Sequence, residues 1–416
     1  MGFEVELPPD EEFDEIMREQ LIEMEFQPVV SLVDQRPVGY EAFARGPEGR
    51  LRTPAALFEA AAEAGRSIEL DQLCATLATR AFRAASMPEL ALFVNFNPDT
   101  LSTETDGVAP AYADLMADSN VVVEITEKAV TRRPAGLLDA VGDARRKTAR
   151  IALDDIGIDP ASLAAMPLIN PDVIKLDRTI TQSASTDSHV VNAVLDDARR
   201  RGAQIVAEGV ERPEHIDVAR SLGATFAQGW LFGRPGPLPT DIRPSDQPLA
   251  RVGPRPVARA TPYDVLARVE PVDPTTASQL RAMSASVEEE AARANGPAIL
   301  VVNIGDLRHL APDSPITYAF LTSRGIEVFL IGHGVPFTPG GRVRGIPIAA
   351  DDPLREERTT LLVGSHYGSG VFARQRRHTA GTDITFDAGT SHEWDRVVEA
   401  TLPLVSRVKN EPIDDD

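Results

Sequence analysis

The chain has 416 residues, more than one ordinary domain holds, and this length predicts two or three domains. Its composition is 43% hydrophobic and 25% charged, which supplies enough apolar material for folded cores and excludes a wholly disordered chain. The formal net charge of −21 makes most of the surface repel polyanions, which argues against a nucleic-acid polymer or an anionic membrane as partner. A small anionic ligand held by local cations or metal ions is compatible with this charge.

Cys74 is the one cysteine of the sequence, so a disulfide or a thiolate zinc site within one chain is excluded. Its place in an apolar helical pattern predicts a buried core residue. The acidic N-terminal stretch lacks the features of a signal peptide, and no apolar run approaches the roughly 18 residues that a membrane helix needs. We therefore expect a cytoplasmic protein without membrane insertion.

Over the first 240 residues, short apolar runs alternate with helical patterns. A polar helix is expected at about residues 10–24, and strand candidates follow at residues 26–33, 38–44, 91–96, 121–126, 150–156, 172–177, 203–209 and 226–232. Eight strands with helical crossovers predict an α/β fold of the TIM type, a (β/α)8 barrel. The connection between the first two strands is short and hairpin-like, so strict alternation is not expected there.

The sequence after the eighth strand changes character, because it is rich in proline and has no apolar periodicity. We interpret residues 238–261 as a linker between a barrel domain at residues 1–237 and a second domain at residues 262–409. A helical pattern at residues 276–294 and strand candidates at 297–304, 326–332, 359–365, 370–376 and 382–388 predict a smaller α/β domain. Residues 410–416 form an acidic tail that we expect to be frayed.

Polar residues follow the apolar runs near the C-terminal ends of six predicted barrel strands: Glu41, Asn95, Glu124, Asp154 with Asp155, Lys175 and Glu208. Barrel enzymes place their chemistry on this face. Several carboxylates cannot stay ionised in one crevice without a cation, and their oxygens suit Mg²⁺, Mn²⁺ or Ca²⁺. The adjacent aspartates can hold two ions, as two-metal phosphodiester chemistry requires. Each residue alone could be a strand-end cap, but their succession on one barrel makes chance a poor explanation.

Eight motifs resemble the signature of EAL domains, and they cover about residues 15–237: QPVV (27–30), GYEAFAR (39–45), VNFNP (94–98), EITE (124–127), ALDDIG (152–157), IKLDR (174–178), AEGVE (207–211) and QGWLFGRP (228–235). EAL domains are TIM-barrel phosphodiesterases that linearise the bacterial second messenger cyclic di-GMP to 5′-pGpG. The resemblance therefore implies a metal-dependent hydrolase whose substrate is cyclic di-GMP.

The resemblance also implies a role for each matching residue. One metal ion would be bound by Glu41, Asn95, Glu124 and Asp154, and a second by Asp154, Asp155 and Glu208. Lys175 matches the lysine beside the attacking water, so Lys175, Asp155 and Glu208 are the expected catalytic residues. The substrate contacts implied are Gln27, Arg45 at the non-scissile phosphate, Asp177 and Gln228. Glu211 matches the glutamate that anchors the loop after the fifth strand, and the implied cofactors are two Mg²⁺ or Mn²⁺ ions.

The chain departs from the family pattern at two places. Phe43 replaces the leucine of the name motif, which changes packing volume and removes no ligand. The stretch DDIGIDPASL (154–163) differs from the usual sequence of a loop that couples dimerisation to metal-site geometry in the family. A homodimer through the barrel is expected, with its geometry left open. Two alternatives to an enzyme stay open as well: a receptor that binds cyclic di-GMP without hydrolysis, and a signalling scaffold.

The second domain resembles the DICT domain, a sensory module found with cyclic di-GMP enzymes, in the stretches LVVNIGDLRHL (300–310), EVFLIGHGVP (327–336) and IPIAADDPLREERTTLLVGSHYGSGVFAR (346–374). The resemblance implies that this domain receives an unknown signal or partner and biases the barrel. His333 and His366 each follow a strand in a glycine-rich loop, and they are either a paired ligand site or inert. Trp230 either packs in the barrel, which we favour, or forms a wall beside a guanine.

Overall fold

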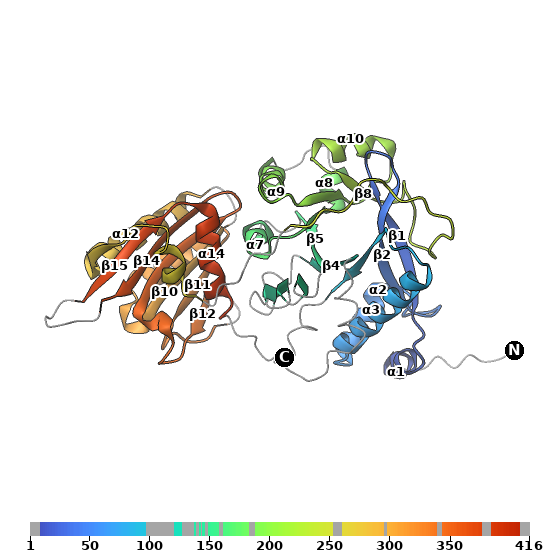
Figure 1. The fold of residues 1–416 in the computed structure, drawn as a ribbon. Coiled ribbons are helices and arrows are strands. Elements are labelled where there is room, and N and C mark those ends of the chain that lie inside the picture. The colour runs from blue at the N-terminus through green and yellow to red at the C-terminus, as the bar shows by residue number, and fades with distance from the viewer. Residues whose placement is uncertain are drawn as a thin grey trace.

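The computed structural model describes residues 9–96, 120–126, 137–138, 141–142, 144–145, 149–157, 161–182, 188–252, 260–294, 298–338, 343–376 and 384–407. Two α/β units lie side by side in Figure 1, the barrel first along the chain and the second unit after it. None of the described helices is long and apolar enough to cross a membrane.

The first unit is a closed barrel of eight strands that follow one another in chain order. They are β1 (Glu23–Ser31), β2 (Pro37–Arg45), β3 (Ala91–Asn95), β4 (Val121–Thr126), β5 (Arg150–Ile156), β6 (Val173–Leu176), β7 (Gln204–Ala207) and β8 (Phe226–Gln228). Strand β1 is antiparallel to both of its neighbours, and the other pairs are parallel. The predicted barrel and its hairpin-like start are confirmed, since only a short connection joins β1 to β2.

Helices surround this barrel as the crossover pattern predicts. The described ones are α1 (Pro9–Glu19), α2 (Pro54–Glu63), α3 (Ser67–Ala84), α7 (Ala161–Ile169), α8 (Arg178–Gln182), α9 (Ser188–Arg201) and α10 (Pro213–Ser221). Helices α1, α2 and α3 share a small apolar core with the end of β2, and Cys74 is buried in it, as predicted.

The barrel floor is filled by apolar side chains of the strands, among them Val38, Val122, Ala152 and Val206. Side chains alternate along a strand, so the residue two positions after a floor residue also points into the barrel. These later inward positions carry the polar residues of the carboxyl face. One floor residue, Leu249, comes from outside the barrel strands.

Leu249 belongs to residues 238–252, which contain no helix or strand and cross the amino-terminal ends of the barrel strands. The Ser245 amide donates to the Pro37 carbonyl at 2.9 Å, and the Val252 amide donates to the Asp172 carboxylate at 2.6 Å. The Ala250 amide donates to the Gln204 side chain at 2.6 Å. We call residues 238–252 the floor strap, because the proline-rich stretch predicted to be a linker is here bound across the barrel floor.

The second unit is built on a seven-stranded sheet of order β12-β11-β10-β13-β14-β15-β9. Its strands are β9 (Asp273–Thr276), β10 (Ala298–Asp306), β11 (Ile326–His333), β12 (Val343–Pro347), β13 (Glu357–Gly364), β14 (Gly368–Gln375) and β15 (Thr385–Ser391). Strands β10, β11 and β12 are parallel, and every other pair is antiparallel. The five predicted strands are present, and β9 and β12 are additional.

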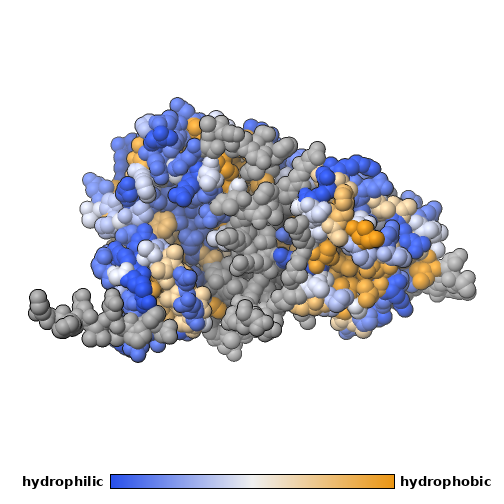
Figure 2. All heavy atoms as spheres, turned by 180° about the vertical axis from the view of Figure 1, so that it is seen from behind, coloured by the Kyte–Doolittle hydropathy of each residue, from blue (hydrophilic) through white to orange (hydrophobic). Residues whose placement is uncertain are grey.

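The helices of this unit cover both faces of the sheet. They are α11 (Pro262–Leu266), α12 (Ala277–Arg293), α13 (Ser314–Ser323) and α14 (Trp394–Val405), with the short 3₁₀ helices η2 (Leu307–His309) and η3 (Pro353–Glu356). Helices α12 and α13 pack on one face, and α11 and α14 pack on the other. Apolar surface is concentrated on this second unit, at the right of Figure 2.

The barrel and the second unit share one apolar core. Helix α7 contacts β10, β13 and α14, and α7 lies beside α14 in Figure 1. Leu163 and Met166 of α7 belong to the same buried cluster as Val301 of β10 and Val397 of α14. The ring of Trp394, the first residue of α14, lies under the Arg201 guanidinium at 4.8 Å. The two units are therefore joined through α7 and not only through the chain.

Candidate active site

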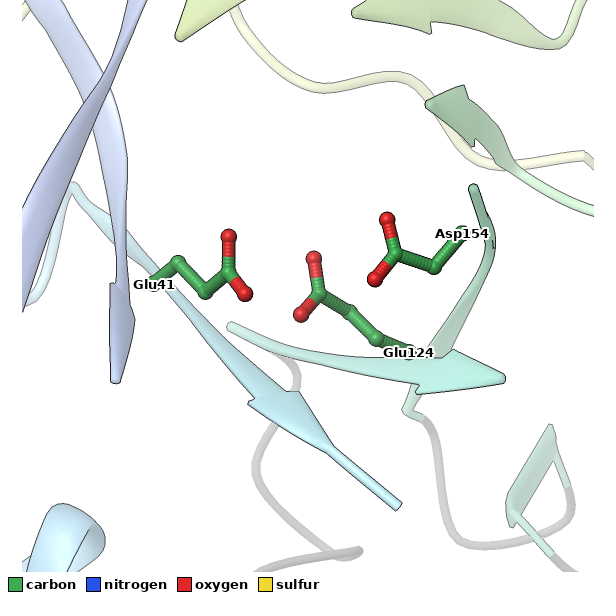
Figure 3. Close-up of side chains that lie close together, drawn as sticks. All are labelled: Glu41, Glu124 and Asp154. Atoms are coloured by element: carbon green, nitrogen blue, oxygen red, sulfur yellow. The ribbon is translucent and has the colours of Figure 1, made fainter. Parts of the chain in front are cut away.

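Three buried carboxylates converge at the carboxyl ends of the barrel strands. Glu41 of β2, Glu124 of β4 and Asp154 of β5 point toward one another in Figure 3. One carboxylate oxygen from each lies within 4.8 Å of the others, a spacing that could hold a metal ion. Strand pairing sets this arrangement, because Asn95 of β3 lies beside Glu124 in the register and its amide donates to Glu41 Oε1 at 3.0 Å.

A second set of carboxylates consists of Asp154, Asp155 and Glu208, so the two sets share Asp154. Its ligand oxygens also lie within 4.8 Å of one another. Neighbouring residues of a regular strand point to opposite faces, so two adjacent aspartates could not both serve one site. Asp155 has a left-handed backbone with φ 58°, and the pairing of β5 with β6 shifts register between Leu153 and Ile156. This bulge brings both carboxylates to the site, and no residue pattern predicts it.

The Lys175 ammonium, on β6, lies in the middle of these carboxylates. Its Nζ is 2.9 Å from Glu41 Oε2, 2.7 Å from Glu124 Oε1, 3.0 Å from Asp154 Oδ1 and 2.8 Å from Glu208 Oε1. The lysine is 1% exposed, so these ion pairs are shielded from solvent. One buried cation thus faces four anions, and it offsets only part of their mutual repulsion.

Three acids of the site and Lys175 have raised pKa values. Burial raises the pKa of Glu208 to about 8, although Lys175 opposes the shift. Burial and the Glu41 charge raise the pKa of Glu124 well above its usual range, and burial and Asp154 raise the pKa of Asp155. Burial disfavours the charged form of Lys175, but the four carboxylates outweigh it and raise the lysine pKa. When the acids of the site are ionised, additional positive charge would therefore reduce their mutual repulsion.

Two amide side chains complete one wall of the site. Gln228, at the end of β8, donates through Nε2 to Glu41 Oε2 at 2.7 Å and to Gln27 Oε1 at 3.0 Å. Gln27 of β1 lies opposite Glu41 in the β1–β2 register and donates to the Gly233 carbonyl at 2.9 Å. The structure thus brings both glutamines predicted from the motifs to the carboxylate cluster.

Three other predicted site residues have different partners. Arg45 forms an ion pair with Glu25 at 2.8 Å, and the sequence analysis missed this partner although Glu25 and Gln27 share one face of β1. Asp177 accepts from the Thr179 amide at 2.8 Å and so caps the start of α8. Glu211 is exposed, and its backbone amide donates to His215 Nδ1 at 3.2 Å.

The favoured interpretation of Trp230 as a barrel-packing residue is wrong. Trp230 follows the end of β8 and is 51% exposed. The Arg234 guanidinium lies over its ring at 3.8 Å from the centroid. Trp230 therefore presents an open aromatic face just beyond the strand that ends in Gln228.

The residues of the site fit hard divalent cations. All the charged ligands are carboxylate oxygens, which Mg²⁺ and Mn²⁺ prefer. Among the described residues, the fully buried Glu124 Oε2 has no hydrogen-bond donor, a costly arrangement unless a cation satisfies it. When Glu41, Glu124, Asp154, Asp155 and Glu208 are all ionised, they and Lys175 carry a formal charge of −4, which two divalent ions would cancel.

Comparison with known proteins gives a family match over the barrel. The family model for the EAL domain matches residues 10–235. The chain is 28% identical over 227 residues to the probable cyclic di-GMP phosphodiesterase PdeG of Escherichia coli strain K12, covering 50% of this chain and 44% of that protein. It is 32% identical over 167 residues to the cyclic di-GMP phosphodiesterase RocR of Pseudomonas aeruginosa, covering 39% and 43%. The match covers less than half the length of each of these relatives.

A solved structure with a similar fold is the FimX EAL domain of Xanthomonas citri, determined in complex with c-diGMP. It matches at a TM-score of 0.50 and 21% sequence identity, over 57% of this chain and 96% of that one. At this identity the likeness shows the barrel fold. The family match ends at residue 235, so the resemblance of the second unit to a DICT domain stays a prediction.

Proposed function

The chain belongs to the EAL-domain family, and from that premise we propose that its barrel hydrolyses cyclic di-GMP to 5′-pGpG with two divalent metal ions. The observation that carries the proposal is the pair of carboxylate groups, sharing Asp154, that surround Lys175 at the carboxyl face of the barrel. A receptor without activity would have no need to keep both groups complete. The relatives named as phosphodiesterases agree with this reading.

One ion would be held by Glu41, Asn95, Glu124 and Asp154, and the other by Asp154, Asp155 and Glu208. Mg²⁺ or Mn²⁺ would supply charge neutralisation at the scissile phosphate and activation of water. Asn95 would offer its amide oxygen, since its contact with Glu41 uses the amide nitrogen as donor. The left-handed backbone of Asp155 supports this scheme, since it turns a second carboxylate toward Glu208.

Lys175 is proposed to orient the attacking water and to stabilise charge on the phosphoryl oxygens. Its ammonium can serve this role because the surrounding carboxylates hold it protonated, and because it is fixed by packing inside the barrel. Lys175 Nζ lies 3.0 Å from Asp154 Oδ1, so its N–H donors would lie beside the ligand that both metal ions share.

The substrate would be oriented by residues on the β1 and β8 side. Gln27 and Gln228 are proposed to offer amides to the nucleotide, and Arg45 its guanidinium to the non-scissile phosphate. The amides lie within hydrogen-bond distance of the carboxylate site, whereas Arg45 would have to exchange its contact with Glu25. The exposed ring of Trp230 is suited to stacking on a guanine base, the alternative role considered for it from the sequence.

The second unit is proposed to bias the activity of the barrel. Helix α7, which it contacts, follows β5 along the chain, and β5 carries both metal-binding aspartates. A change in the second unit that moved α7 would therefore act close to Asp154 and Asp155. Such regulation requires two arrangements of this interface with different affinities for the input. A homodimer through the barrel also remains part of the proposal.

The test is incubation of the purified full chain with cyclic di-GMP and Mn²⁺, followed by chromatographic separation of the nucleotides. The proposal predicts 5′-pGpG from the wild-type chain and none above background with EDTA. Binding of cyclic di-GMP without turnover would instead establish the receptor alternative, and neither binding nor turnover would favour the scaffold.

A further inference from the structure

Charged side chains, most of them basic, gather at the edge of the second sheet where its parallel strands end. The group comprises Asp306, Arg308, His309, His333, Arg355 and Arg358, and we call it the edge cluster. Strands β10 and β11 end there, at Asp306 and His333, and antiparallel β13 begins beside them. After β10 the chain continues to β11 on one side, and β13 lies on the other side of β10. Open α/β sheets bind ligands at the strand ends where the connections diverge to the two sides.

The Asp306 carboxylate lies near two arginines and one histidine of this cluster, at distances longer than those of close ion pairs. Asp306 Oδ2 is 3.4 Å from Arg355 Nη2 and 3.6 Å from His333 Nδ1, and Oδ1 is 3.6 Å from Arg308 Nε. Charge-assisted hydrogen bonds are shorter, about 2.7–2.9 Å. Asp306 therefore keeps the cations nearby without closing the contacts, so their N–H groups remain available to another acceptor.

Arg358 adds a cation with no acidic partner. Among the described residues it has no carboxylate within 4.0 Å, and its Nη1 donates to the Glu357 and Arg355 carbonyls at 2.6 and 3.1 Å. Its Nη2 is 2.8 Å from His309 Nδ1. Burial and the charges of Arg358 and Arg308 lower the pKa of His309, so the imidazole is neutral and accepts this hydrogen bond. Among the described residues, Arg308 and Arg355 thus share Asp306, and Arg358 has no carboxylate partner.

The acidic residues that flank Arg355 and Arg358 do not neutralise them. Asp352 forms an ion pair with Arg407 at 3.1 Å, and Glu357 forms one with Arg374 at 2.6 Å. Asp351 and Glu356 are exposed to solvent. With histidines counted as neutral, Arg308, Arg355, Arg358 and Asp306 carry a formal charge of +2, in a protein whose net charge is −21.

The edge cluster is built on fixed backbone. The buried Asn303 accepts from the Gly305 amide at 3.0 Å and donates to the Leu354 carbonyl at 2.9 Å, which ties β10 to η3. Gly305 has φ 65°, and any side chain there would overlap the Arg358 guanidinium. The β10–β11 register shifts at this point. Asn303 and Gly305 therefore set the positions of Asp306, Arg355 and Arg358 in advance of any ligand.

We propose that the edge cluster binds a small phosphate-bearing ligand. A phosphate monoester offers several acceptor oxygens and a charge of about −2, which matches three arginines arranged around one carboxylate. Arg308, Arg355 and Arg358 supply the donors, and His333 lines the side formed by β11. Binding at this site does not depend on the activity of the barrel.

The test is isothermal titration calorimetry of the full chain with inorganic pyrophosphate, in EDTA so that no metal ion in the barrel can hold the probe. The wild-type chain should bind saturably, and Arg308→Gln and Arg355→Gln should each weaken binding by about tenfold or more. Asp306→Asn should tighten it, because the competing carboxylate is gone. The matched control is Arg293→Gln, an arginine as exposed as Arg308 but at the end of α12, which should bind like the wild type.

Circular dichroism melting would establish that each variant is folded. Arg308 is 71% exposed, so its substitution decides the matter even where Arg355→Gln is unstable. Absence of saturable binding by the wild type would overturn the proposal, and so would equal affinity of wild type, Arg308→Gln and Arg293→Gln. Citrate binding as tight as pyrophosphate binding would refute the assignment to phosphate chemistry.

Discussion

The Lys175 ammonium lies 2.7 Å from Glu124 Oε1, and both side chains are enclosed by the barrel. A buried pair of this kind contributes little stability in itself, but removal of one partner leaves an uncompensated charge. Three more carboxylates contact the same ammonium, so Lys175 connects the two carboxylate groups that share Asp154. This relationship makes the lysine the most informative residue of the barrel.

Lys175→Met should lower turnover of cyclic di-GMP by roughly 100-fold or more, because a buried donor aimed at developing charge is lost. Nucleotide binding should change much less, since Gln27, Gln228 and the metal ligands are retained. Turnover is measured by nucleotide chromatography and binding by calorimetry. Arg18→Met, which removes an exposed cation, is the control. Parallel loss of binding and turnover would contradict a catalytic role for the lysine.

Glu208→Gln should have opposite effects on stability with and without metal. In EDTA at pH 8 the variant should melt at a higher temperature than the wild type, because one of four mutually repelling carboxylates is gone. In Mn²⁺ the wild type should melt higher, since a ligand present at 100 times its Kd stabilises by about 2.7 kcal/mol. Differential scanning calorimetry checks both. The metal assignment would be wrong if Mn²⁺ stabilised both proteins equally.

A substitution in the floor strap should change the free energy of unfolding although it lies on the face opposite the active site. Leu249→Ala should lower the free energy of unfolding by about 2–5 kcal/mol, because Leu249 is buried among the apolar residues of the barrel floor. Leu21→Ala, at a leucine that is 46% exposed, should change it by much less, about 0.5 kcal/mol. Urea unfolding measures the difference. Equal effects would mean that residues 238–252 are a free linker after all.

Helix α7 supplies a test of communication between the two units. Met166→Ala and Leu57→Ala remove fully buried side chains from α7 and α2, and each should destabilise by about 2–5 kcal/mol. Only Met166→Ala should also change the rate of cyclic di-GMP hydrolysis at a temperature where both variants are folded. The reason is that α7 contacts the second unit and follows the strand that bears Asp154 and Asp155. Unchanged turnover in Met166→Ala would argue against coupling through α7.

Most of the barrel could be predicted from the sequence, because its strands are apolar runs and its site residues stand at their ends. The second sheet was predicted less completely. Strands β9 and β12 were missed, and both are edge strands, where proline and polar residues are tolerated and apolar patterning is weak. His333 and His366 were considered as a pair, but His333 ends β11 and His366 comes after β13. Because β11 is parallel to β10 and β13 is antiparallel to it, the two histidines lie at opposite ends of the strands.

The site residues were predicted better than their contacts. Glu41, Glu124, Asp154 and Lys175 could be selected as candidates from their position near the ends of apolar strand runs. Such a position places a residue at the carboxyl face of the barrel. Local backbone conformation and contacts between residues far apart in the chain cannot be predicted from such a sequence pattern. The left-handed Asp155 and the Glu25 partner of Arg45 depend on tertiary packing, and so does the binding of a proline-rich stretch across the barrel floor.

The central claim is most directly tested by comparing cyclic di-GMP hydrolysis by the wild-type chain and Asp154→Asn in Mn²⁺. Asp154 is shared by both carboxylate groups, and the isosteric amide keeps its shape while removing its charge. The account predicts 5′-pGpG from the wild type at a rate at least about 100-fold above that of the variant. Comparable rates, or intact cyclic di-GMP after binding to the wild-type chain, would contradict it.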